Sequence, residues 1–108
     1  MSTIVVNVAR RPDLSHAEFV SYWRERHAPL IRSCPQFTEN LVSYTQYDAH
    51  AGPKDLASLF GGSGGYDGVA VLRFRNRHAL DAAFASDDYC NTIRPDEPNF
   101  VDLDNCSA

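Results

Sequence analysis

The stretch that decides the fold spans residues 19–30 and reads FVSYWRERHAPL. It holds the only Trp of the chain, Trp23, with Tyr22 beside it and His27 four positions later. Side chains four positions apart share one face of a helix, so Trp23 and His27 fall on one stripe. The pattern predicts an apolar helix face that carries a titratable ring. His27 is then either a reactive group in a pocket or a satisfied residue of the core.

A strong helix-start signal precedes this stretch. Ser15 and Glu18 form an S-x-x-E capping box, which predicts a helix from about residue 16 to about residue 32. Pro29 falls inside this helix, donates no amide hydrogen and clashes with the carbonyl four residues earlier. We therefore expect a kink at Pro29, or a break near His27 followed by a short second piece.

The rest of the chain predicts an α+β fold. Four segments have the composition or alternation of strands: 3–9, 40–48, 67–75 and 99–103. Asn76 can cap a second helix from residue 78 to about 85, followed by a short further turn, and residues 94–98 read as a proline-containing turn. The order β-α-β-β-α-β is that of a ferredoxin-like fold, an antiparallel four-stranded sheet with helices on one face. The other face carries β-branched and aromatic side chains, so we expect a second copy to cover it in a homodimer.

Length and composition limit the function classes. The chain has 108 residues, which predicts a single domain over residues 1–108, with a Gly-rich loop at about 49–66 and a frayed tail at 104–108. The net charge is −4 and Lys54 is the only lysine, so we expect neither nucleic acid nor a membrane as partner. The three cysteines lie far apart and fit no zinc or redox spacing. The start of the sequence shows no signal-peptide pattern. We therefore expect the protein in the reducing cytoplasm.

Other polar residues are candidates for chemistry beside His27. Asp67, at the start of the third strand, either shapes a turn or acts as an orienting or acid–base partner. Asn7 either hydrogen-bonds within the sheet or points a donor at a substrate oxygen. Arg73 either forms an ion pair at the rim of the sheet or dimer, or binds substrate. The sequence contains no phosphate loop, nucleophile elbow or metal-ligand spacing, so we expect no metal and no cofactor.

Several motifs, in their order along the chain, resemble the EthD-like branch of the dimeric α/β-barrel proteins. They are F-x-x-YW-x-x-x-HAPL at 19–30, YDGVA at 66–70, AAFASDDY at 82–89 and PDE-x-x-FVD at 95–102. The resemblance implies a ferredoxin-like subunit, a dimer whose two sheets close into a barrel, and a small-molecule cavity in each subunit. It also implies that members of the family usually work without a metal or an organic cofactor. The Gly-rich run at 61–65 departs from the family pattern and leaves the shape of the pocket open.

Relatives in the wider superfamily include cyclases, decarboxylases and dehydratases of polyketide or phenolic compounds, muconolactone isomerases and cofactor-free monooxygenases. We therefore expect a cofactor-independent lyase or cyclase for a small aromatic or polyketide-like substrate. The alternatives are a non-catalytic dimeric module that binds a hydrophobic metabolite, and a cofactor-free monooxygenase, which differs by requiring oxygen.

The expected roles of the site residues follow from that reaction. His27 is the general base or acid, and Asp67 orients it or shuttles a proton. Tyr22 or Tyr44, together with Asn7, hold the developing oxyanion. The remaining substrate contacts are expected from Trp23, Phe60, Arg73 and Phe84.

Overall fold

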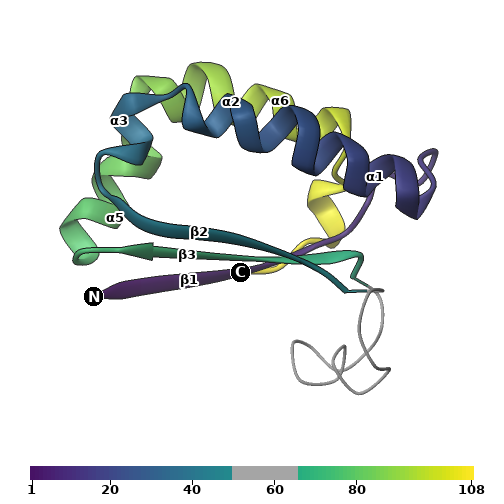
Figure 1. The fold of residues 1–108 in the computed structure, drawn as a ribbon, viewed down its shortest axis with the longest axis horizontal. Helices are drawn as coiled ribbons and strands as arrows, with labels where there is room; N and C mark the ends of the chain where they lie inside the picture. The colour runs from purple at the N-terminus through teal and green to yellow at the C-terminus, as the bar shows by residue number, and fades with distance from the viewer. Residues whose placement is uncertain (50–65) are drawn as a thin grey trace.

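Helices cover one face of a three-stranded antiparallel sheet in the computed structural model, which describes residues 1–49 and 66–108 (Figure 1). The strands are β1 (Ser2–Val8), β2 (Leu41–Asp48) and β3 (Gly68–Phe74). They lie in the order β1-β3-β2, so β3 is the central strand. Its Ala70 pairs with Val6 on one side and with Gln46 on the other. The α+β class and the antiparallel pairing are as the sequence predicted.

The expected fourth strand at residues 99–103 does not form within the described part of the chain. Two 3₁₀ turns, η3 (Glu97–Asn99) and η4 (Leu103–Asn105), bracket an isolated bridge between Val101 and Arg10. The two turns leave too few extended residues for a ladder. A second bridge joins Ser107 to Asn7 of β1, so residues expected to form a frayed tail lie against the sheet.

The first helical run, residues 16–32, contains a π-helical turn just before Pro29. Such a turn has one residue more than a regular α-helical turn. Helix α1 (His16–Tyr22) passes directly into the π-helical segment η1 (Trp23–His27) and then into α2 (Ala28–Arg32). In the wide turn the amide of Ala28 donates to the carbonyl five residues earlier. A π turn relieves the clash that a proline ring causes in the preceding turn. The helix therefore continues through Pro29, where the sequence predicted a kink or a break.

The second helical run contains the same feature. Segment η2 (Tyr89–Ile93) is also π-helical and passes directly into α6 (Arg94–Asp96). Pro95 stands two residues after the end of η2, the same spacing as in the first run. Residues 94–98, expected as a turn, are therefore helical, because the wide turn accommodates the proline without ending the helix.

The helix-start signals of the sequence are confirmed. Ser15 accepts a hydrogen bond from the amide of Glu18, and the Glu18 side chain accepts one from the amide of Ser15. Asn76 caps α5 (Arg77–Ala85) by accepting from the amide of Ala79. Between the two helical runs, the short α3 (Pro35–Thr38) leads into β2.

Trp23 packs across the start of the central strand in the core between helices and sheet. A side chain at Gly68 would overlap the indole ring of Trp23, so the first residue of β3 has to be glycine. The largest fully buried side chains of this core are Phe19, Phe37, Phe74, Ile93 and Phe100. The glycine of the YDGVA motif therefore serves the packing of the only Trp.

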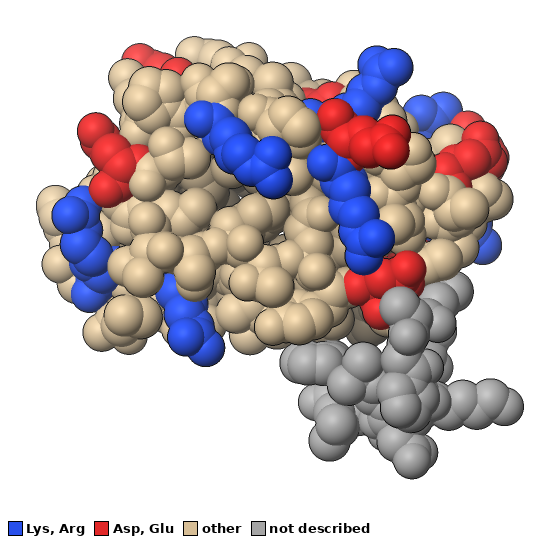
Figure 2. Space-filling model, viewed as in Figure 1, with Lys and Arg blue, Asp and Glu red and all other residues tan. Residues whose placement is uncertain are grey.

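The two faces of the sheet differ. The helices pack on the face that carries Ala70 and Leu72. On the other side, Val5 and Tyr47 are 40% and 43% exposed, and Val42 near the edge is 49% exposed. Basic and acidic side chains are interspersed over the molecular face drawn in Figure 2. None of the helices in the described ranges is long and apolar enough to cross a membrane.

Candidate functional site

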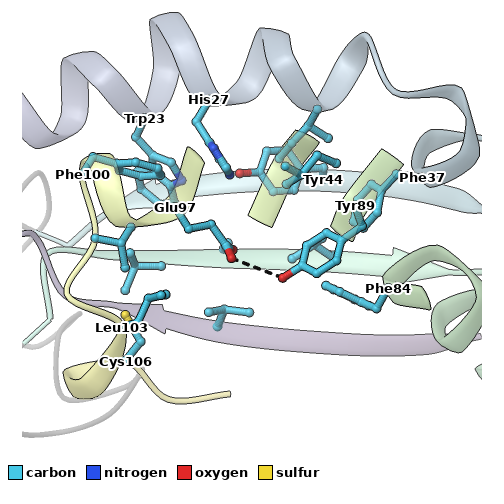
Figure 3. A pocket seen from close by; sticks show the side chains of 17 residues that line it. Trp23, His27, Phe37, Tyr44, Phe84, Tyr89, Glu97, Phe100, Leu103 and Cys106 are labelled. Carbon is cyan, nitrogen blue, oxygen red and sulfur yellow. Dashed lines mark hydrogen bonds between the residues drawn. The ribbon is translucent and has the colours of Figure 1, made fainter. Parts of the chain in front are cut away.

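An apolar cavity of about 120 Å³ lies between the helices and the sheet. Its walls come from all three strands, both helical runs and the C-terminal turns (Figure 3). Aromatic rings form much of the lining, among them Trp23, Phe37, Phe84 and Phe100. Besides the indole of Trp23, the lining side chains with polar atoms are His27, Tyr44, Tyr89, Glu97 and Cys106.

His27 is held at this cavity by Asp96. Nδ1 of His27 lies 2.9 Å from Oδ2 of Asp96. The other carboxylate oxygen of Asp96 accepts from the Tyr22 hydroxyl at 2.5 Å and from the Asn99 amide at 3.1 Å. An ionised carboxylate only accepts hydrogen bonds, so Nδ1 carries the proton of the neutral ring and Nε2 keeps a lone pair.

The environment sets the charges of this pair. Burial lowers the pKa of His27 below its ordinary value, although Asp96 acts in the opposite direction. Burial alone would raise the pKa of Asp96, but the hydrogen bonds from Tyr22, His27 and Asn99 together lower it. At neutral pH the pair is therefore a neutral imidazole on an ionised carboxylate.

His27 is the last residue of the π turn of the first run and forms part of the cavity wall. One additional residue in the turn shifts the buried stripe by one position. Trp23 is buried before the shift, and the consecutive residues His27 and Ala28 are both buried after it. Figure 3 shows His27 pointing from the helix toward the sheet.

Glu97 and Tyr89 form a second polar group inside the cavity. The hydroxyl of Tyr89 donates to Oε1 of Glu97 at 3.3 Å. Burial and the nearby Glu97 raise the pKa of Tyr89 to about 12, and burial raises the pKa of Glu97 as well. The carboxylate and the hydroxyl meet between the helix layer and the sheet (Figure 3).

Tyr44 is the third polar group of the lining. Its hydroxyl oxygen accepts from the side-chain amide of Gln46 at 3.0 Å. Burial raises the pKa of Tyr44, so the hydroxyl keeps its hydrogen. Because the oxygen already accepts, the hydrogen can be donated to a ligand.

The predicted site residues lie at several different places in the fold. His27, Trp23, Tyr44 and Phe84 all line the cavity. Tyr22 lies behind His27 with its hydroxyl on Asp96 and its ring stacked on Phe100. The position predicted for the remaining wall residue, Phe60, lies outside the described residues.

The predicted partner Asp67 lies at another place, at the end of the sheet. Its Oδ1 is 2.9 Å from Nδ1 of His16, and its Oδ2 accepts from the amide of Arg10 at 3.1 Å. The second ring nitrogen of His16 lies 2.7 Å from Asp48. Asp67 thus contacts His16, whereas another carboxylate contacts His27. Across residues 1–49 and 66–108, no group of three or more potential ligands is arranged to hold a metal ion.

Asn7 and Arg73 lie on the strand positions that face away from the helices. Arg73 is exposed, and Asn7 donates from Nδ2 to the hydroxyl of Ser107 at 3.0 Å. The buried Oδ1 of Asn7 has no hydrogen-bond partner in the described part of the chain. Neither side chain lines the cavity.

Sequence reasoning missed the contributions of Asp96, Glu97 and Tyr89. The two acidic residues stand in a run with two prolines, which is typical of a solvated turn. The available signal was the PDE-x-x-FVD motif at 95–102, which places both carboxylates just before the buried Phe100. Only the continuation of the second helix through Pro95 turns this motif toward His27.

Comparison with known proteins gives a family and a fold. The family model of the EthD domain matches residues 11–104. A crystal structure of an ethyl tert-butyl ether d (EthD) family protein from Bacillus halodurans C-125 is similar, with a TM-score of 0.60. The match covers 90% of this chain and 85% of that one at 16% sequence identity, which supports the fold. No curated protein matches this sequence significantly.

Proposed function

The chain belongs to the EthD family, and we propose that it is a cofactor-independent lyase or cyclase in which His27 moves a proton to or from a substrate carbon. One observation carries the proposal. The contact of Nδ1 with Asp96 leaves Nε2 of a neutral, buried imidazole at the wall of an apolar cavity. A positioned imidazole with a free lone pair is the usual general base near neutral pH.

The candidate reactions share one chemical step. Decarboxylation, dehydration and aldol-type cyclisation all pass through an enolate or phenolate, with a proton leaving or joining the adjacent carbon. Nε2 of His27 would take that proton, and the carboxylate of Asp96 would stabilise the imidazolium that forms. The Tyr44 hydroxyl would donate to the developing oxyanion, an interaction that is worth roughly 3–4 kcal/mol in a dry site.

The cavity volume narrows the substrate class. An apolar cavity of roughly 150 Å³ is large enough to hold benzene. At about 120 Å³, this cavity corresponds to a single small ring. We therefore propose a single-ring phenolic or carbonyl substrate in place of a polyketide with several rings.

The proposal includes a homodimer formed through the sheet face opposite the helices. Val5 and Tyr47 lie on that face with large exposed fractions, as does Val42 near its edge. Burying such side chains against a second copy removes apolar surface from water, which favours association.

A direct experiment incubates the protein with single-ring phenolic and β-keto acids without added cofactor, with and without oxygen, and follows the products by chromatography. Oxygen-independent turnover supports the lyase or cyclase. Turnover that requires oxygen identifies a cofactor-free monooxygenase. Binding of these compounds without turnover identifies a non-catalytic module for small apolar metabolites, a role that the apolar walls also suit.

A further inference from the structure

Two acceptor atoms at the cavity have no hydrogen-bond partner among the described residues. They are Nε2 of His27, whose other ring nitrogen contacts Asp96, and Oε2 of Glu97, whose other oxygen accepts from Tyr89. The two side chains come from different elements, His27 from the end of the first π turn and Glu97 from the residue after α6. Besides the Tyr44 hydroxyl, the cavity therefore has two acceptor positions in largely apolar walls.

Both positions accept hydrogen bonds. His27 has its single proton on Nδ1, so Nε2 offers a lone pair. Glu97 offers a carboxylate oxygen above its own pKa, which burial raises from the ordinary carboxyl range. The hydroxyl of Tyr89 already donates its hydrogen to the other oxygen of Glu97. A ligand that satisfies this cavity must therefore bring two donors.

The lining decides which donors suit these positions. An ammonium group is strongly hydrated, and apolar walls that include Trp23, Phe84 and Phe100 do not replace the contacts with water that it would lose. Hydroxyl groups are neutral donors with a small desolvation cost. The volume of about 120 Å³ limits the ligand to a single small ring.

We infer that the ligand of this cavity is a single six-membered ring with two hydroxyl groups, one donating to Nε2 of His27 and the other to Oε2 of Glu97. This inference rests on the proposed function for the role of the cavity as the substrate site. It adds that Glu97 determines specificity, a role that neither the family nor the fold assigns.

The arrangement should discriminate strongly against ligands that lack one hydroxyl. A hydrocarbon ring of the same size would take both acceptors out of contact with water and leave them unpaired. Sites built to bind a hydroxyl group reject the analogue that lacks it, because their own buried polar groups then stay unsatisfied. Each hydroxyl should therefore tighten binding by about tenfold.

The test measures the dissociation constants of toluene, phenol and the three dihydroxybenzenes by NMR titration at pH 8. The unaltered protein should prefer the best dihydroxybenzene to phenol, and phenol to toluene, by about tenfold each. In Glu97→Leu the preference of dihydroxybenzene over phenol should fall to about one. The exposed Glu25→Gln, on the first helical run, is the matched control and should keep the full series.

The toluene affinity of each variant reports whether the cavity is intact, so a loss of folding is not mistaken for a loss of specificity. Equal affinities across the series, absence of binding, or a dihydroxybenzene preference that survives Glu97→Leu would each overturn the inference. A preserved preference without any catalysis would contradict only the proposed lyase or cyclase, because binding here is measured without turnover.

Discussion

Nδ1 of His27 and Oδ2 of Asp96 lie 2.9 Å apart, although 69 positions separate the two residues in the chain. His27 is the last residue of one π turn, and Asp96 follows three residues after the other. Each π turn stands just before a proline that a regular helix would not accommodate. The two prolines thus help to create the irregular turns from which the candidate base and its carboxylate face each other.

Asp96→Asn should lower kcat by roughly 10²-fold or more, because a neutral amide stabilises the imidazolium less and does not fix the tautomer of His27. KM should change little, since Asp96 lies behind His27 and does not line the cavity. The kinetics of the product assay check both values. Asp81→Asn, at an exposed ion pair on α5, is the control and should keep full turnover.

The protein should lose stability as the pH falls below about 6.5. Burial lowers the pKa of His27 in the folded state, so the unfolded chain binds this proton more readily. The contribution of His27 is therefore complete above the ordinary value of 6.5 and declines as the pH falls toward the lower folded-state pKa. Urea unfolding between pH 7.5 and pH 5 measures the slope. His27→Phe should reduce it, and an unchanged slope would contradict this assignment.

Gly68→Ala should destabilise the protein by about 1–3 kcal/mol, because the new methyl group would overlap the indole ring of Trp23. Urea unfolding measures the loss. The double variant Trp23→Phe with Gly68→Ala separates this clash from a general strand effect. The smaller ring should make the Gly68→Ala change less costly, and strictly additive losses would rule out the proposed overlap.

Val5→Glu should convert the proposed homodimer into monomers, because it places a charge on the exposed sheet face. Sedimentation velocity at several protein concentrations measures the mass. Glu25→Lys, on the helical side of the molecule, should leave the dimer intact. A protein that is monomeric without any substitution would contradict the proposed dimer directly.

The sequence predicted the regular parts of the fold well because local signals carry them. The capping residues Ser15 and Asn76 marked two helix starts, and alternation marked the central strand. The proline-containing segments were harder, because a proline predicts a kink or a turn and gives no sign that a π turn absorbs it. For this reason the sequence could not show that residues 94–98 continue a helix.

The same limit applies to the candidate site. His27 and Trp23 were recognisable because a titratable ring on an apolar stripe is unusual. Asp96 could not be assigned to His27, since the contact depends on both π turns and on a separation of 69 positions. Asp67 was predicted as the partner of His27 because it stands at the start of a strand. Its own partners are His16 and Arg10, which come from the segment around the start of α1.

The most direct measurement of the central claim follows proton exchange at carbon, the step that all candidate reactions share. Resorcinol and cyclohexanone are incubated in D₂O with the protein, and NMR records deuterium incorporation at the ring or α carbon. We predict cofactor-free, oxygen-independent exchange that falls by at least about 10²-fold in His27→Ala, with the folded structure confirmed by circular dichroism. Exchange that persists unchanged in a folded His27→Ala variant, or no exchange of either compound by the unaltered protein, would contradict the role of His27 as the base.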